Sequence, residues 1–455
     1  MNEDFVQYFR CPPSFSSFRP IVDTNVSHAS KGYFKFGPET ICYGAFSKAA
    51  SNCDSELTDA SEFVQIIDES CRLPFDPGEI ATNLRRERYV EQDNSSLPKR
   101  FARQIYYVLR PAFPVAFRRH LQRLWLKNWN QIPFPKWPVD RTVDCMFERL
   151  MYYALRSQRE TEIPFIWFWP DGQTSCAVMT HDVETAFGVE FVEQLMDVND
   201  SFSIKSSFQL IPAARYTVTR KLLESIKKRG FEANVHDLRH DGHLYDDLAG
   251  FKEAAAEINH FARQFGSMGF RSGALYRNQE WYGELQVAYD MSVPNIGHLD
   301  PQRGGCCTVM PYYVGSVLEI PVTMTQDYTL FNVFNKYSLD LWREQLCLIM
   351  RQHGMASFIV HPDYIQTEQS IDTYKQLLAY LSELRDKERM WIALPGEVNA
   401  WWRKRNEMSL LLKDGRWQIE GEGSERARIA YARIENDTVT YRLRDERSAI
   451  SVPWS

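Results

Sequence analysis

The stretch Ser175-Cys-Ala-Val-Met-Thr-His-Asp-Val-Glu184 decides the fold that the sequence predicts. Small and β-branched residues over 176–180, entered from a Pro-Asp-Gly turn at 170–172, are typical of a buried parallel strand. Asp182 and Glu184 follow two residues apart, so an extended chain points both carboxylates to the same side. Like charges held this close are costly unless a cation or a proton lies between them. We therefore expect the chemistry of the protein at the end of this strand.

Short apolar runs and amphipathic helical patterns alternate along the chain from residue 173 to residue 405. The predicted strands are 204–211, 231–235, 268–271, 317–322, 356–361 and 390–394, and the predicted helices are 217–228, 248–265, 280–289, 338–353, 371–385 and 398–405. Repeated βα units with glycine at helix ends predict parallel strands. About seven such units suit a closed or nearly closed barrel better than an open sheet. The predicted fold class is therefore α/β.

The two flanks of this region show different patterns. Residues 1–172 predict an α+β region, with a hairpin over 32–46 and a short charged helix over 83–89. Residues 406–455 alternate between apolar and polar positions and are rich in turns, which predicts a small antiparallel β appendage.

A basic and aromatic stretch lies within the first flank. Residues 94–139 contain no Asp or Glu but nine Lys or Arg, interleaved with apolar and aromatic residues. One interpretation is a pair of amphipathic helices that dock the N-terminal region onto the next domain. The other is a surface that contacts anionic headgroups or a lipid-linked substrate, which would make the protein a peripheral membrane protein.

Composition narrows the possible partners and the compartment. A net charge of −6 argues against a general nucleic-acid-binding protein. The nine scattered cysteines include no Cys-x-x-Cys pair, which favours reduced thiols over a disulfide framework. There is no run of about 18 apolar residues and no signal-peptide pattern at the N-terminus, so we expect a cytoplasmic protein.

Further ionisable residues fall at the ends of the predicted strands. His236 and His240 are four residues apart, a spacing that puts two imidazoles on one side of a helical turn, where they can share a metal with a carboxylate. Arg271 ends one strand and His361 ends another. Each feature alone also has an ordinary interpretation. The two carboxylates could be a solvated pair and the two histidines could lie on the surface. Arg271 could form a structural ion pair, and His361 could cap a loop. Because all of them fall at the end of a barrel where active sites are built, together they indicate a metal-dependent hydrolase.

These residues resemble the motifs of the polysaccharide deacetylases of carbohydrate esterase family 4, over roughly residues 173–400. The matching positions are Thr180-His-Asp-Val-Glu184 for the first motif, His236 and His240 for the His-x3-His motif, Arg271 for the Arg-x-Pro motif, Asp290 for the weakly defined fourth motif, and His361 for the late Leu-x-His motif.

The resemblance implies a distorted (β/α)7 barrel that holds one divalent metal ion, often zinc, with cobalt or nickel as alternatives. It implies that Asp182 is the general base, that Arg271 orients it, and that His361 is the general acid. It also implies that His236, His240 and an acidic residue of the first motif bind the metal. A backbone N–H near Leu275 or Tyr276 would help to hold the oxyanion.

The sequence departs from the family pattern at three positions. Val183 stands where the family has a second Asp, so either Glu184 is the metal ligand, or Asp182 is the ligand and another group is the base. Gly273 replaces the Pro of the Arg-x-Pro motif. His181 replaces the usual Phe and is a further candidate ligand, as are His243 and Asp241.

The function expected from the sequence is removal of an acetyl group from an N-acetylated sugar. Nucleotide-linked or lipid-linked glycan precursors of a surface polysaccharide, at the inner face of the membrane, are the expected substrates. Two alternatives stay open: a non-catalytic glycan-binding or scaffold protein, and another metal-dependent amidohydrolase or phosphoesterase on the same barrel.

Overall fold

The computed structural model describes residues 3–20, 30–67, 69–90 and 129–443 of the 455-residue chain. The basic stretch predicted over residues 94–139 therefore lies outside the described residues up to position 128.

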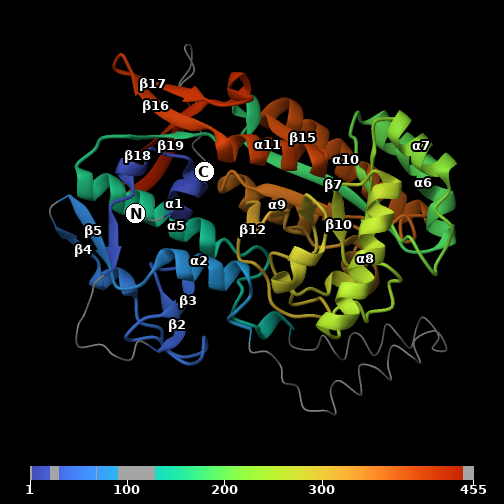
Figure 1. Cartoon of the computed structure of the whole chain (residues 1–455), viewed down its shortest axis with the longest axis horizontal. Coiled ribbons are helices and arrows are strands. Elements are labelled where there is room, and N and C mark those ends of the chain that lie inside the picture. The colour runs from blue at the N-terminus through green and yellow to red at the C-terminus, as the bar shows by residue number, and fades with distance from the viewer. Residues whose placement is uncertain (1–2, 21–29, 68, 91–128, 444–455) are drawn as a thin grey trace.

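A mostly parallel sheet forms the centre of the larger part of the molecule (Figure 1). Its strands are β7 (Ser175–Val183), β8 (Ser207–Leu210), β9 (Glu232–His236), β10 (Gly269–Arg271), β11 (Tyr289–Asp290), β12 (Tyr312–Val314), β13 (Val317–Glu319), β14 (Met355–Ile359) and β15 (Met390–Ala393). The order is β12-β13-β11-β10-β9-β8-β7-β14, with β15 also paired to β7. All of these pairs are parallel except β12 with β13.

The sheet is curled, and an irregular segment after β13 connects its two sides. The Asn295 N–H donates to the Val322 carbonyl at 2.7 Å, and the Met324 N–H donates to the Ser357 carbonyl at 3.2 Å. Residues 322–324 thus run between the extension of β11 and β14 without forming a full strand. The predicted α/β barrel is confirmed, and its distortion consists of this irregular segment together with several strands of only two or three residues.

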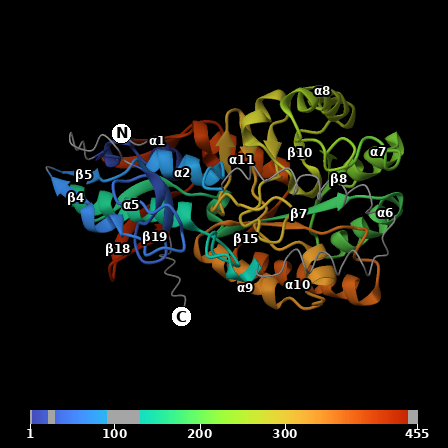
Figure 2. The same ribbon diagram turned by 90° about the horizontal axis from the view of Figure 1, so that it is seen from below.

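Helices cover the outer face of the sheet (Figure 2). They are α6 (Ala186–Ser201), α7 (Arg220–Lys228), α8 (Leu248–Phe265), α9 (Asp340–Arg351), α10 (Glu368–Glu388) and α11 (Pro395–Glu407). Side chains of Thr185, Thr219, Asp247 and Thr367 cap the N-termini of α6, α7, α8 and α10. These helices hold the strands that carry the candidate site.

The helix predicted over residues 280–289 is wrong. The chain forms a 3-10 segment, Gln279–Glu284, and then enters β11. Leu285, Val287 and Tyr289 are buried at every second position, which is the period of an extended chain. Gly283 also lowers the helix propensity of this stretch.

Both flanks pack together at one end of the barrel. The N-terminal flank contains α1 (Glu3–Phe9), α2 (Pro77–Arg85), α5 (Thr142–Gln158), β1 (Phe18–Pro20), β4 (Gln65–Ile67), β5 (Ser70–Leu73) and β6 (Ile163–Ile166). It also contains the predicted hairpin, as β2 (Lys31–Lys35) and β3 (Ile41–Ala45). The charged helix predicted over 83–89 is displaced, because Asp76 caps α2 and Pro77 starts it.

The C-terminal flank forms the predicted antiparallel strands. The hairpin of β16 (Ser409–Lys413) with β17 (Arg416–Glu420) precedes β18 (Ile429–Glu435) and β19 (Thr438–Leu443). Strand β18 also pairs with β6, so the two flanks share a three-stranded sheet.

A buried ion pair joins the N-terminal flank to the barrel. The Arg277 guanidinium donates to both carboxylate oxygens of Glu87, and the side chains are 1% and 9% exposed. Asp144 of α5 accepts hydrogen bonds from the Thr308 hydroxyl at 2.7 Å and from the Val309 N–H at 2.8 Å. The flank is thus fixed to the loops around the candidate site.

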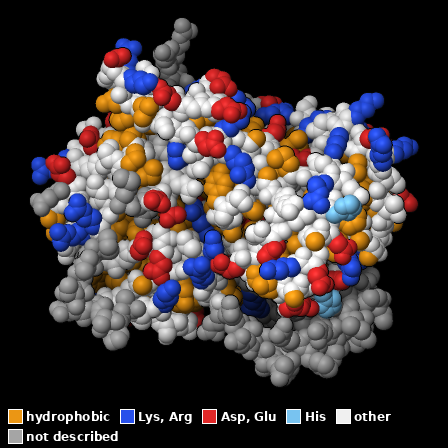
Figure 3. Space-filling view, viewed as in Figure 1, with side chains coloured by type: hydrophobic (Ala, Val, Ile, Leu, Met, Phe, Trp, Pro, Cys, Tyr) orange, Lys and Arg blue, Asp and Glu red, His pale blue; other side chains and the backbone are white. Residues whose placement is uncertain are grey.

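The surface is charged but mixed. Figure 3 shows acidic and basic side chains interspersed over the described part of the face that it draws. Over the described residues, no helix combines the length and the apolar character that a membrane crossing requires.

Candidate metal centre

The carboxyl ends of neighbouring parallel strands bring the predicted residues together. Asp182 lies in β7 and Glu184 follows that strand directly. His236 is the last residue of β9, Arg271 is the last residue of β10, and His361 follows β14. Because parallel strands end at one edge of the sheet, these side chains converge on one small volume.

Glu184, His236 and His240 form a three-residue cluster whose ligand atoms all lie within 4.8 Å of one another. Glu184 Oε1 is 3.2 Å from His240 Nε2, and the two imidazole ring centroids are 4.9 Å apart. His236 Nδ1 lies 3.1 Å from the Arg271 carbonyl and donates to it, which leaves Nε2 as the nitrogen that faces the cluster.

Both Nε2 atoms of this cluster are buried, and within the described part of the chain His240 Nε2 pairs with Glu184 Oε1, while His236 Nε2 makes no hydrogen bond. A buried polar atom without a partner is costly, and His236 Nε2 is such an atom within 4.8 Å of the ligand atoms of Glu184 and His240. Two imidazole nitrogens and a carboxylate oxygen are a common protein ligand set for zinc. The residues present therefore fit a divalent metal ion.

The loop that carries His240 is not the helical turn expected from the spacing. Asp237 and His240 have φ values of 56° and 54°, so the chain reverses tightly after β9. Asp237 Oδ2 accepts the Gly273 N–H at 2.9 Å. A Cβ at position 273 would lie 2.5 Å from that oxygen and 3.0 Å from His240 Cδ2. Glycine at 273 is therefore required for the close approach of the two loops.

Asp182 is held as an ionised carboxylate beside the cluster. Arg271 Nη1 donates to its Oδ1 at 3.1 Å, while its Oδ2 lies 3.9 Å from His236 Nε2. Burial by itself raises the pKa of Asp182, but the Arg271 guanidinium, with His236 and His361, brings that pKa below its usual value. One oxygen is thus fixed by arginine and the other faces the site.

His361 lies on the other side of Glu184 and is held by Asp327. Its Nδ1 lies 2.7 Å from Asp327 Oδ1, its backbone N–H donates to Asp327 Oδ2 at 2.8 Å, and its Nε2 is 3.8 Å from Glu184 Oε1. Burial lowers the pKa of His361, but Asp327, followed by Glu184 and Asp182, raises it to about 10. The Nδ1–H of the imidazole therefore donates to Asp327, and its Nε2 faces Glu184.

Asp327 contacts His361 and is a candidate site residue that the sequence analysis missed. It lies in Met324-Thr-Gln-Asp-Tyr328, beyond the strand predicted over 317–322, so its position after a strand end was the available signal. Asp290 was predicted instead. The structure places Asp290 in β11, where its carboxylate accepts the Tyr282 hydroxyl at 2.8 Å and the Ser292 N–H at 2.8 Å.

His181 is also turned away from the cluster, because successive residues of a strand face opposite sides. Its Nδ1 lies 2.9 Å from the Val360 carbonyl and its Nε2 lies 3.1 Å from Asn199 Nδ2. Burial lowers the pKa of His181 to about 4. The structure therefore makes His181 a neutral core residue and not a metal ligand.

The remaining candidates lie around the cluster. Tyr276 is buried, and its backbone N–H donates to the Gly273 carbonyl at 3.2 Å, so the oxyanion contact expected from an N–H near Leu275 or Tyr276 stays a prediction. His243 Nδ1 pairs with Asp246 at 2.8 Å on the exposed side of the loop. Asp241 accepts the His243 N–H at 3.0 Å.

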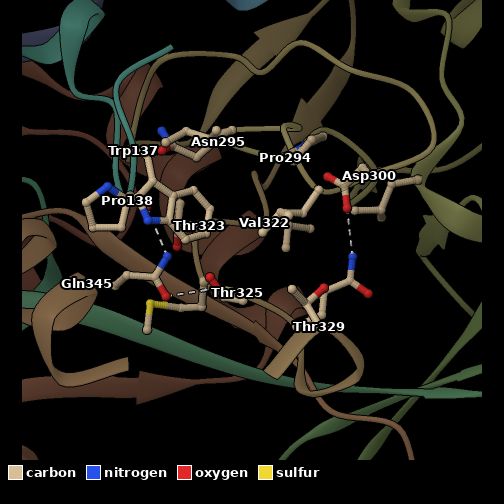
Figure 4. Close-up of a pocket in the computed structure, with 15 residues that line it drawn as sticks. Trp137, Pro138, Pro294, Asn295, Asp300, Val322, Thr323, Thr325, Thr329 and Gln345 are labelled. Atoms are coloured by element: carbon tan, nitrogen blue, oxygen red, sulfur yellow. Dashed lines mark hydrogen bonds between the residues drawn. The ribbon is translucent and has the colours of Figure 1, made fainter. Parts of the chain in front are cut away.

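A small cavity of about 30 Å³ lies between the segment 322–326 and the N-terminal flank (Figure 4). Trp137 and Pro138 form one wall, and Gln345 of α9 donates to the Pro138 carbonyl at 3.0 Å. A volume of this size has room for about two water molecules and not for a sugar ring. The residues of the metal cluster are not among those that line it.

No protein-family model matches the sequence, and no curated protein matches it. Among solved structures, the chain is similar to a protein named as a polysaccharide deacetylase from Mycobacterium smegmatis, with 19% identity and a TM-score of 0.43 over 52% of this chain and 93% of that chain. It is also similar to an allantoinase, with 14% identity and a TM-score of 0.41 over 52% and 92% of the two chains.

A peptidoglycan deacetylase from Bacillus subtilis is similar as well, with 13% identity and a TM-score of 0.31 over 51% of this chain and 93% of that chain. Further similar structures are described as members of carbohydrate esterase family 4. This is the family that the motifs of the sequence resemble.

Proposed function

We propose that the protein is a metal-dependent hydrolase that removes the acetyl group from an N-acetylated sugar. The observation that carries this proposal is the buried cluster of Glu184, His236 and His240, in which His240 Nε2 faces Glu184 Oε1 at 3.2 Å and His236 Nε2 makes no hydrogen bond within the described residues. A paired carboxylate lies on one side of this cluster and a protonated imidazole on the other. A metal hydrolase needs these three parts within one site.

Glu184, His236 and His240 would hold one divalent ion, with zinc favoured and cobalt or nickel as alternatives. When bound, such an ion lowers the pKa of water and polarises the acetyl carbonyl. In this arrangement Glu184 is the ligand, because its carboxylate groups with both histidine nitrogens within 4.8 Å, whereas Asp182 pairs with Arg271 through Oδ1.

Asp182 and His361 would carry the proton transfers. As water adds to the acetyl carbon, the free Oδ2 of Asp182 takes a proton from it, and Arg271 keeps the other oxygen in place. As the C–N bond breaks, His361 Nε2 gives its proton to the leaving nitrogen. Asp327 holds the opposite ring nitrogen and so fixes the orientation of the imidazole. The products are acetate and a free amine.

The protonated His361 favours an N-acetyl over an O-acetyl group, because an amine is the poorer leaving group and needs a proton from an acid. We further propose a nucleotide-linked or lipid-linked glycan precursor of a surface polysaccharide as substrate, handled in the cytoplasm at the inner face of the membrane. The membrane contact through residues 94–139 stays a prediction.

The test begins with the metal content of the full chain purified without chelator. Wild type is expected to hold about one equivalent of zinc or a similar ion, and His236→Ala with His240→Ala to hold none. His243→Ala is the matched control, since this nearby histidine pairs with Asp246 outside the cluster. A wild type that neither contains nor takes up zinc, cobalt or nickel would overturn the proposal.

Acetate release from a panel of N-acetylated sugars and their nucleotide conjugates is the second measurement. Asp182→Asn is expected to keep the metal and lose acetate release, because it removes the base but not a ligand. One bound metal without acetate release from any member of the panel would favour a glycan-binding protein. A second metal equivalent with hydrolysis of phosphate esters would favour a phosphoesterase.

A further inference from the structure

Glu184 lies one residue beyond the end of β7, where the backbone leaves the hydrogen-bonded ladder and turns toward α6. A long side chain at such a position has many rotamers, and ordering it costs up to about 2 kcal/mol. Its exposed fraction is nevertheless only 20%, and besides His240 it contacts the loop His361-Pro-Asp-Tyr364 that follows β14.

Asp363 of this loop holds the backbone at Glu184. Its Oδ2 accepts the Glu184 N–H at 3.1 Å, and its Oδ1 accepts the Thr185 hydroxyl. Thr185 Oγ1 in turn accepts the Gly188 N–H at 3.2 Å and caps α6. The carboxylate thus fixes both the end of β7 and the start of α6.

Gly188 is what lets Asp363 approach so closely. A Cβ at position 188 would lie 2.5 Å from Asp363 Oδ2 and 2.8 Å from its Cγ. No real side chain tolerates that distance, and the close contact is with a carboxylate that is already bonded on both oxygens.

Tyr364 holds the side chain of Glu184. Its hydroxyl donates to Glu184 Oε2 at 3.1 Å, while Glu184 Oε1 lies 3.2 Å from His240 Nε2. The Tyr364 ring centroid is 5.0 Å from that of His361. One carboxylate oxygen is therefore occupied by the phenol, and the other is presented to the histidines.

We propose that Asp363 and Tyr364 are positioning residues that fix Glu184 as a one-oxygen metal ligand at a set distance from His361. This inference rests on the proposed metal-dependent function. Within the end of β7, Val183 is fully buried in the apolar core and Asp182 is paired with Arg271, so the proposed ligand is the first residue outside the strand, and the loop supplies the contacts that hold it. Partners that orient a metal ligand in this way typically change metal affinity 10–100-fold when they are removed.

The test is the dissociation constant of the metal-free protein for Co²⁺, followed by visible absorption, and for Zn²⁺, followed by competition with a chromophoric chelator. Tyr364→Phe keeps the ring against His361 and is expected to weaken binding roughly 10–100-fold. Tyr374→Phe is the matched control, because it removes a buried hydroxyl that donates to Asn199 on the far side of β7. Its affinity is expected to stay within about threefold of wild type.

Asp363→Asn and Asp363→Ala provide a second readout. Asparagine keeps one acceptor oxygen, so it is expected to retain more affinity than alanine, and alanine is expected to alter the Co²⁺ absorption spectrum by freeing Glu184. If Tyr364→Phe fails to fold, this Asp363 pair carries the test alone. Affinities of the Tyr364 and Asp363 variants within about threefold of wild type would overturn the inference.

The two proposals fail in different ways. A wild type that binds one metal but releases no acetate contradicts the proposed deacetylation, while the affinities of the variants still decide the positioning role. A wild type that binds no metal overturns both.

Discussion

Asp327→Asn is expected to lower the pKa of His361 by several units in the metal-free protein. The substitution removes the charge that lies 2.7 Å from His361 Nδ1 but keeps an oxygen that can accept the same hydrogen bond. Two unit charges about 3 Å apart interact by roughly 5 kcal/mol at an effective dielectric constant of about 20, or nearly four units of pKa. Burial lowers the pKa of His361. Asp327 raises it most, and Glu184 and Asp182 raise it by smaller amounts. The pKa should therefore fall from about 10 to near the ordinary value for histidine.

NMR titration of ¹³C-labelled histidine side chains measures this pKa directly, without a substrate. The His361 resonance is identified by its absence in His361→Gln. A wild-type pKa below about 8, or a pKa that Asp327→Asn leaves unchanged, would refute the assignment of His361 as a proton donor held by Asp327.

The contact between His361 and Asp327 also predicts how the free energy of unfolding depends on pH. A histidine whose pKa is raised on folding stabilises the protein fully below its unfolded pKa of about 6.5, and the stabilisation is lost as pH rises through about 10. The difference in unfolding free energy between wild type and Asp327→Asn should therefore be largest near pH 6 and smallest above pH 10. Part of this difference in unfolding free energy is expected to stay the same at every pH. In Asp327→Asn the side-chain amide nitrogen would face the backbone N–H of His361, so that hydrogen bond is lost. Chemical denaturation across this range tests the trend, and a difference that grows with pH would contradict it.

Three further predictions concern the buried groups and the metal. Arg277→Met leaves the Glu87 carboxylate buried without its partner, so denaturant titration should show a loss of about 3–5 kcal/mol, and Glu87→Gln with Arg277→Met should cost less than the sum of the single changes. Ser357→Ala removes a buried hydroxyl that makes no hydrogen bond within the described residues, and the unfolding free energy should stay within about 1 kcal/mol of wild type. Removal of the metal by a chelator should lower the melting temperature, and free metal restored to 100 times its dissociation constant should return about 2.7 kcal/mol of stability. An unchanged melting curve after chelation would count against a bound metal.

The parts of the site that follow from strand order and spacing could be predicted from the sequence. His236, Arg271 and His361 each end or follow a strand of the sheet, and parallel strands all end at one edge. The motif positions therefore indicated convergence even where their loop conformations were unknown. The loop after β9 shows this limit, because the spacing of His236 and His240 suggested a helical turn and the chain instead forms a tight reversal.

The parts that depend on long-range contacts could not be predicted. Asp327 has no motif of its own, and its role follows from the irregular segment that passes β14 and brings it to His361. Helix α6 was not among the predicted helices, although its buried residues Gly188, Val192, Leu195, Met196 and Asn199 follow helical spacing, because glycine and asparagine at two of these positions weaken the apolar pattern. His181 was a candidate ligand because it replaces the usual Phe of the first motif, but a strand sends its side chain and that of Asp182 to opposite faces.

Strand alternation also explains why the carboxylates of this chain are two residues apart. His181 and Val183 are fully buried on the core side of β7, so Asp182 is the only position near the end of the strand that faces the cluster among residues 181–183. The next residue on the same face is Glu184, which lies past the last ladder contact of β7. A ligand beyond the strand has no sheet to hold it, and a glutamate has one more rotatable bond than an aspartate. The contacts of Asp363 and Tyr364 fall on the backbone and on the carboxylate of that residue, the two places where a ligand outside the sheet would otherwise be loose.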